Sequence, residues 1–87
     1  MSSVPSPVTV RLFAAHADAA GASQTTVLVS PPVTVAAVKA AVAHAHPALA
    51  ALGVERALMA INYTYAGNTE PVAPGDEVAL IPPVAGG

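Results

Sequence analysis

The sequence closes with the run GDEVALIPPVAGG, residues 75–87. Its apolar part, Val78–Ile81, leads into Pro82–Pro83, which donate no backbone hydrogen bond and fix φ at about −65°, so a strand must stop there. The chain then narrows to Gly86–Gly87, and without a Cβ atom these residues can enter a slot too narrow for others. The run therefore predicts a final strand and an extended, exposed tail that ends in a reachable carboxylate.

The composition limits the classes of function. A chain of 87 residues forms one small domain that buries only about 60–65% of its unfolded surface. Charged residues make up 9% and the net charge is −2, so the protein lacks the basic field that nucleic acids or anionic membranes require. No apolar run approaches the roughly 20 residues of a membrane helix, and no signal peptide is visible. We therefore expect a cytoplasmic protein with no nucleic-acid or membrane partner.

The sequence contains no cysteine. This excludes disulfides, thiolate metal sites and a thiol nucleophile. The C-terminal carboxylate therefore remains as the anchor for any group that the protein carries.

Three regions follow from the distribution of prolines, serines and glycines. Residues 1–7 contain three serines and two prolines and are expected to be a disordered lead-in. Residues 8–81 form the folded domain, and residues 82–87 form a flexible tail.

The first half of the domain predicts two strands and a short helix. In the strand over residues 8–13, alternation places Val8, Val10 and Leu12 on one face and Phe13 on the other. Residues 14–20 are rich in helix formers and end at a glycine suited to a helix C-terminus. Residues 25–29 are rich in β-branched side chains and predict the second strand.

The main helix is expected from Val35 to about His46, with Thr34 as its N-cap. Apolar residues recur at the i, i+3 and i+7 positions of this segment, and Pro47 stops the helix. Residues 48–52 are interpreted as a final helical turn. A third strand is expected over residues 57–62, a continuation through residues 63–66 to a turn at 67–68, an edge strand at 70–72, and a turn at 73–76.

This order of elements predicts an α+β fold. It fits a β-grasp, the ubiquitin-like fold, with a mixed sheet of four to five strands, one main helix and a short second helix. The first and last strands are expected to lie parallel at the centre of the sheet.

The side chains offer little for catalysis. His44 and His46 have no neighbouring carboxylate in sequence to orient them, and we expect His16, His44 and His46 to be exposed or at helix ends. Asp76 and Glu77 are adjacent, which points them to opposite faces of a strand, and we expect them to stabilise a turn and interact with solvent. No catalytic triad, phosphate loop or metal spacing is present. The chain is therefore not expected to be an enzyme by itself or to bind a metal.

The C-terminal run resembles the ubiquitin-like sulfur carriers, and most of all the small subunits of molybdopterin synthase. Weaker points of similarity are residues 10–14, 34–35 and 60–62. The resemblance implies that Gly87 is adenylated by an ATP-using enzyme similar to ubiquitin-activating enzymes. A sulfur donor protein then converts the adenylate to a thiocarboxylate. Ala85 stands where the family often has Ser or Thr, and residues 63–65 lie where it varies.

In that family the tail inserts into a large catalytic subunit, and the assembly is a heterotetramer. The sulfur passes to cyclic pyranopterin monophosphate and builds the dithiolene of molybdopterin. The resemblance implies that Gly86, Ala85 and Val84 of this sequence would enter the slot of the large subunit. No permanently bound cofactor is implied.

Alternation also predicts where a partner would dock. Phe13 and Ile81 fall on the sheet face away from the helix, and nothing in so short a chain can cover them. Tyr65 is a weaker third member of this exposed patch, and Pro82–Pro83 adjoin it. Family resemblance also places the subunit interface here. The alternative is that Phe13 curls under the short helix and belongs to the core.

Other functions remain open. The protein could carry sulfur for the thiazole of thiamine or for an amino acid. It could also be a ubiquitin-like modifier joined to lysines by an isopeptide bond, or a β-grasp binding module with an inert tail.

Overall fold

The computed structural model describes residues 4–82. The predictions for residues 1–3 and for the tail residues 83–87 lie outside this part of the chain. The described elements are, in order, β1 (Ser6–Leu12), α1 (Ala14–Ala20), β2 (Gln24–Val29), α2 (Val35–Ala45), α3 (Pro47–Ala51), the 3-10 turn η1 (Val54–Arg56), β3 (Leu58–Ile61), β4 (Thr64–Ala66) and β5 (Val78–Ile81).

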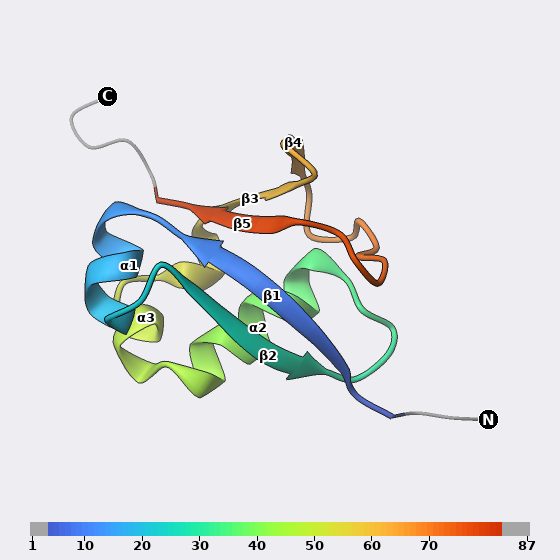
Figure 1. Cartoon of the computed structure of the whole chain (residues 1–87), viewed down its shortest axis with the longest axis horizontal. Helices are drawn as coiled ribbons and strands as arrows, with labels where there is room; N and C mark the ends of the chain where they lie inside the picture. Colours follow the sequence, from blue (N-terminus) through green and yellow to red (C-terminus); the bar gives the residue numbers. More distant parts are fainter. Residues whose placement is uncertain (1–3, 83–87) are drawn as a thin grey trace.

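The five strands form one mixed sheet in the order β2-β1-β5-β3-β4 (Figure 1). β1 and β5 are parallel neighbours at its centre, and the other pairs are antiparallel. The predicted β-grasp is therefore confirmed. The main helix corresponds to α2 and the short second helix to α1.

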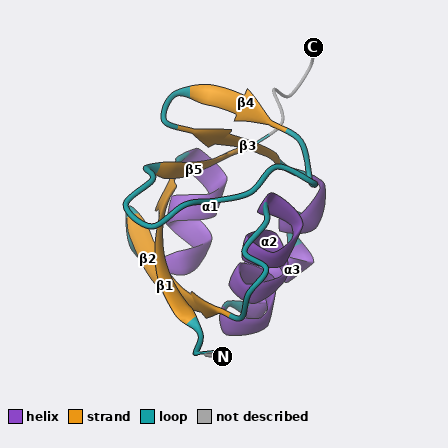
Figure 2. Ribbon diagram, turned by 90° about the vertical axis from the view of Figure 1, so that its right-hand side faces the viewer, coloured by secondary structure: helices purple, strands orange, loops and turns teal. Residues whose placement is uncertain are grey.

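All the helices lie on one side of the sheet, which leaves its other side open (Figure 2). The core between sheet and helices is made of aliphatic side chains. The alternation predicted for β1 is confirmed, because its inward residues are buried and its outward residues are exposed. The largest fully buried side chains are Leu12, Leu49, Met59, Leu80, Val10, Val35, Val38, Val42, Val54 and Val78.

β1 begins earlier than predicted. The sequence predicts a disordered lead-in through Pro7, but Ser6 and Pro7 pair with Val29 and Leu28 of β2. β5 pairs only with residues 10–12 of β1, so the first half of β1 has a neighbour on one side only. A proline is tolerated in such a half-paired stretch because its missing N–H removes no bond from a second ladder.

α2 begins and ends close to its predicted bounds. The Thr34 hydroxyl accepts a hydrogen bond from the backbone N–H of Ala37 (3.2 Å), as an N-cap does. Pro47 ends α2 and is also the first residue of α3, a position where its missing N–H costs nothing. The predicted final turn is therefore a separate helix. None of the helices in residues 4–82 is long and apolar enough to cross a membrane.

The region after β3 differs from the prediction. The chain reverses at Asn62 and Tyr63, which have φ of 51° and 70°, and β4 returns antiparallel to β3. The edge of the sheet next to β3 is thus β4, and the prediction of a strand at 70–72 is wrong. Pro71 makes only an isolated bridge to Thr34. Residues 70–72 instead cross the N-terminal end of α2, because that end has backbone N–H groups without helical partners.

Candidate functional site

The root of the tail lies in the middle of the sheet. Ile81 ends β5, and its cross-strand partner in β3 is Leu58. Because β1 runs parallel to β5 and pairs Leu12 with Leu80, Phe13 comes next to the same end. The start of the tail therefore lies next to this part of the open sheet face.

A groove of about 350 Å³ runs along the open face next to this root. Its apolar end contains Phe13 and Tyr65, which are 44% and 69% exposed, and the half-buried Ile81. Its lining residues are Arg11, Phe13, Ala60, Tyr63, Tyr65, Glu77, Ala79 and Ile81. The structure thus brings together the three residues predicted to form a patch, and Phe13 is not part of the buried core. Pro82 is half-buried beside them, whereas Pro83 lies outside the described residues.

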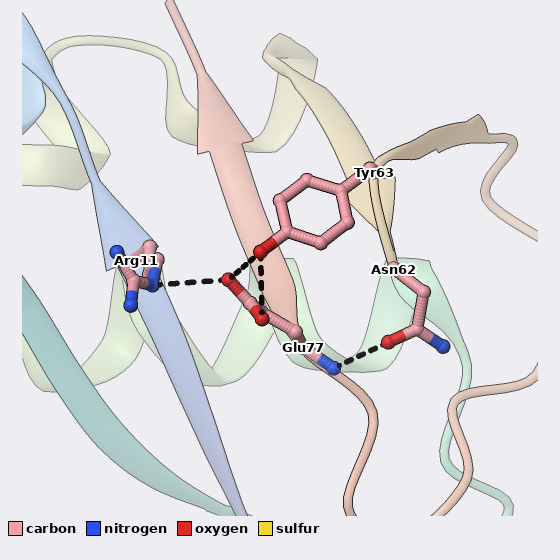
Figure 3. A network of polar contacts seen from close by, with 4 residues as sticks. All are labelled: Arg11, Asn62, Tyr63 and Glu77. Atoms are coloured by element: carbon pink, nitrogen blue, oxygen red, sulfur yellow. Dashed lines mark hydrogen bonds and ion pairs between the residues drawn. The ribbon is translucent and has the colours of Figure 1, made fainter.

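The polar end of the groove is an ordered network centred on Glu77 (Figure 3). Arg11 Nε lies 3.2 Å from Glu77 Oε2, and the Tyr63 hydroxyl donates to both carboxylate oxygens at 3.1 Å. These side chains come from β1, from the β3–β4 turn and from the residue before β5. A charged, directional group therefore adjoins the apolar end of the groove.

Asn62 ties the β3–β4 turn to the start of β5. Its Oδ1 accepts from the Glu77 N–H at 2.9 Å, and its own backbone N–H donates to the Glu77 carbonyl at 2.8 Å. Its Nδ2 donates to Asp76 Oδ1 at 3.0 Å, and Asp76 Oδ2 accepts from the Ala73 N–H at 2.7 Å. The predicted role of Asp76 in a turn is confirmed. The links that Asn62 makes hold Tyr63 where it can reach Glu77.

Sequence reasoning missed this network. Its signal was the pair Asn62–Tyr63, since Asn readily adopts positive φ and marks turns. The sequence pattern predicts a turn at residues 67–68 instead, which would direct Tyr63 along a strand and away from Glu77.

The three histidines do not meet at one site. His44 is exposed in the last turn of α2, and His46 caps that helix and shares a 2.8 Å hydrogen bond with Thr25 Oγ1, in line with the helix-end prediction. The prediction for His16 is wrong, because this residue is only 2% exposed and its Nδ1 has no hydrogen-bond partner within residues 4–82. It lies on the face of α1 that also carries Ala17 and Ala20, which pack against the core. In residues 4–82 no three His, Asp or Glu side chains gather as metal ligands would.

The tail residues predicted to act, Val84, Ala85, Gly86 and Gly87, lie outside the described residues. The described part of the chain ends beside a central strand with an apolar groove on one side. Such a platform suits a protein whose reactive group is presented to other proteins.

Comparisons with known proteins point in the same direction. The small archaeal modifier SAMP1 from Haloferax volcanii is 34% identical, with a TM-score of 0.81, over 94% of this chain and 100% of that one. A complex of subunits 1 and 2 of the molybdopterin-converting factor from Helicobacter pylori contains a chain that is 25% identical, with a TM-score of 0.61, over 94% of this chain and 100% of that one.

A third structure, a putative molybdopterin-converting factor subunit 1 from Pyrococcus furiosus, is 21% identical over 90% of this chain and 98% of that one, with a TM-score of 0.75, and supports the fold. No curated protein matches significantly. The family model named ThiS family matches residues 10–87, nearly the whole sequence including the Gly-Gly end. The chain therefore belongs to the ThiS family and is a ubiquitin-like sulfur carrier.

Proposed function

We propose that this protein is the sulfur-carrying small subunit of a molybdopterin synthase. The observation that carries the proposal is the family match through Gly87, on a chain whose groove adjoins the root of the tail. In this role the protein supplies a reactive end and a docking surface, and its partners supply catalysis.

The chemistry follows from the terminal carboxylate. An α-carboxyl group with a pKa of about 3.3–3.7 is ionised and unreactive at neutral pH. Attack of a carboxylate oxygen of Gly87 on the α-phosphate of ATP releases pyrophosphate and leaves an acyl-adenylate. Sulfide supplied by a sulfur donor attacks the carbonyl carbon, the C–O bond to AMP breaks as the C–S bond forms, and the product is a thiocarboxylate. The large subunit passes this sulfur to cyclic pyranopterin monophosphate.

The groove is the proposed docking surface for the large subunit. Its apolar end, made by Phe13, Ile81 and Tyr65, exposes large side chains that a partner can bury. Its polar end supplies directional groups that fix the register of a complex. Support also comes from the Helicobacter pylori relative, which is found in a complex with its subunit 2.

The first test concerns the terminus. After incubation with an activating enzyme, ATP and a sulfur donor, intact mass spectrometry should show the exchange of one oxygen for one sulfur on Gly87. Deleting Gly86–Gly87, or adding a residue after Gly87, should abolish this change and alter the free energy of unfolding by less than about 1 kcal/mol. A sulfur found elsewhere in the chain, or a larger loss of stability, would contradict the proposal.

The second test concerns the groove. Phe13→Asp and Ile81→Asp should leave the protein folded and weaken binding of the large subunit by roughly 2 kcal/mol or more, about thirtyfold in Kd. The matched control is Leu28→Asp, on the same open face and 67% exposed but outside the groove lining. Calorimetric titration measures all three. Unchanged affinity in both groove variants would move the docking surface elsewhere.

A second candidate function is protein modification, which the 34% identity to SAMP1 favours. The activated Gly87 would then be transferred to a lysine amine of a target protein. The two functions share the adenylation step and differ in the acceptor. Affinity purification of the tagged protein separates them: a stable complex with a large subunit supports the molybdopterin synthase subunit, and a ladder of isopeptide-linked targets supports the modifier.

A further inference from the structure

Lys39 is the only lysine in the sequence, and it is not available at the surface. The residue lies on α2 and is only 6% exposed. Its Nζ donates a 3.0 Å hydrogen bond to Asn68 Oδ1. Lysine is among the residues that are least often buried, so its burial here requires a reason.

The cover over Lys39 is the segment that crosses the N-terminal end of α2, residues 67–72, here named the strap. The backbone N–H groups of Ala36 and Val35 donate to the strap carbonyls of Asn68 and Glu70, both at 3.0 Å. In return the Val72 N–H donates to the Val33 carbonyl at 2.8 Å. These bonds fix both halves of the strap to the helix end, so Asn68 is held in place over the amine.

A hollow of about 290 Å³ lined by Ala36, Lys39, Glu55 and Asn68 leads to Lys39. An acyl-adenylate that approached through it would bring its phosphate toward the carboxylate of Glu55. Like charges repel more strongly near a protein surface than in bulk water. The hollow therefore opposes the one kind of electrophile that the proposed activation generates.

An exposed lysine would be a hazard for a protein activated at its own C-terminus. A neutral Nζ would attack the carbonyl carbon of an activated Gly87 in another copy. The new C–N bond forms as the C–O bond to AMP breaks, AMP departs with the electron pair, and the nitrogen loses a proton to water. The product is two copies joined by an isopeptide bond, with one carrier end consumed.

We propose that the strap keeps copies of this protein from acylating one another at Lys39. The inference rests on the proposed activation of Gly87 and holds for either candidate function: a sulfur carrier keeps its reactive end, and a modifier is added as a single unit. Burial also lowers the pKa of Lys39, so protonation protects this amine less than it protects an exposed lysine. Shielding by the strap must therefore supply the protection.

The first experiment measures shielding without any activation of Gly87. Ala40→Lys adds an exposed amine at the neighbouring position of α2, so both amines compete in one molecule for a water-soluble N-hydroxysuccinimide acetate. Mass spectrometry should find acetylation at Lys39 at least tenfold slower than at position 40 in the native protein, and equal rates in denaturant. Asn68→Ala should raise the rate at Lys39 severalfold. Equal native rates, or no effect of Asn68→Ala, would overturn the role of the strap.

The second experiment tests the consequence. A C-terminal thioester of the full chain, prepared by thiolysis of an intein fusion, needs no activating enzyme, so its result does not depend on the proposed function. At high concentration the wild-type thioester should form no dimers linked through residue 39, whereas Ala40→Lys should form dimers linked through residue 40. Wild-type dimers that disappear in Lys39→Met would overturn the inference. Failure of enzymatic thiocarboxylation would count only against the proposed function.

Discussion

The two faces of the sheet differ in what they contain, and consecutive residues of β1 show it. Val10 is fully buried against the helices, whereas the next side chain, Arg11, is 56% exposed on the open face. The covered face is packed with aliphatic groups that have no polar function. The open face combines an apolar groove with the Arg11–Glu77–Tyr63 network. Stability is therefore concentrated on one face, and the other is available for recognition.

The largest effect is expected where a charge enters the covered face. Val38→Asp places a carboxylate at a position that is fully buried, and an unpaired buried charge costs several kcal/mol. The total stability of a domain is only about 5–15 kcal/mol, so this variant should be largely unfolded. Circular dichroism and urea titration would measure it. The control Ala40→Asp lies on the exposed side of the same helix and should lose about 1 kcal/mol or less. Equal losses in the two variants would contradict the assignment of faces.

An intermediate effect is expected at Asn62, which organises the open face without belonging to the core. Asn62→Ala removes the bonds of its side chain to Glu77 and Asp76 and places alanine at φ of 51°. We expect a loss of about 1–2 kcal/mol in the free energy of unfolding. Asn62→Gly, which tolerates this φ, should recover part of it. An unchanged free energy of unfolding in Asn62→Ala would show that these bonds do not stabilise the β3–β4 hairpin.

The smallest effect is expected from the charge of Lys39. Because burial lowers its pKa below 10.5 in the folded state, the unfolded chain binds more protons in the window between the folded pKa and 10.5. The contribution of Lys39 to the free energy of unfolding should therefore become less unfavourable as pH rises through that window, so stability should increase. Urea midpoints between pH 8 and pH 10.5, compared with those of Lys39→Met, would reveal it. If the stability of wild type relative to Lys39→Met fell as pH rose, the folded state would favour the ammonium form of Lys39.

Much of the covered face could be predicted because it depends on short-range pattern. The alternation of Val8, Val10 and Leu12 follows from the period of a strand, and Thr34 and Pro47 mark the ends of α2 through local chemistry. The position of β5 followed from the same alternation and from the two prolines after it. Phe13 and Ile81 could be assigned to the open face for the same reason.

The remaining features depend on which segments meet in space. A turn with Tyr63 at φ of 70° is uncommon for a bulky residue, and the hydrogen bonds of Asn62 to distant residues support it. In α1 the small alanines give no hint which face is buried, so His16 could not be assigned to the core. The strap over Lys39 joins residues 29 positions apart, and no local pattern encodes that contact.

The attachment of the tail to β5 also has a mechanical meaning. β5 is held on one side by β1 and on the other by β3, so a pull transmitted through Pro82 acts along a strand and loads both ladders in shear. Their hydrogen bonds then resist together, whereas a strand at the edge such as β4 has only one ladder to share the load. In the proposed function the end is repeatedly inserted into partners and withdrawn, and its attachment to β5 then spreads tension over two ladders.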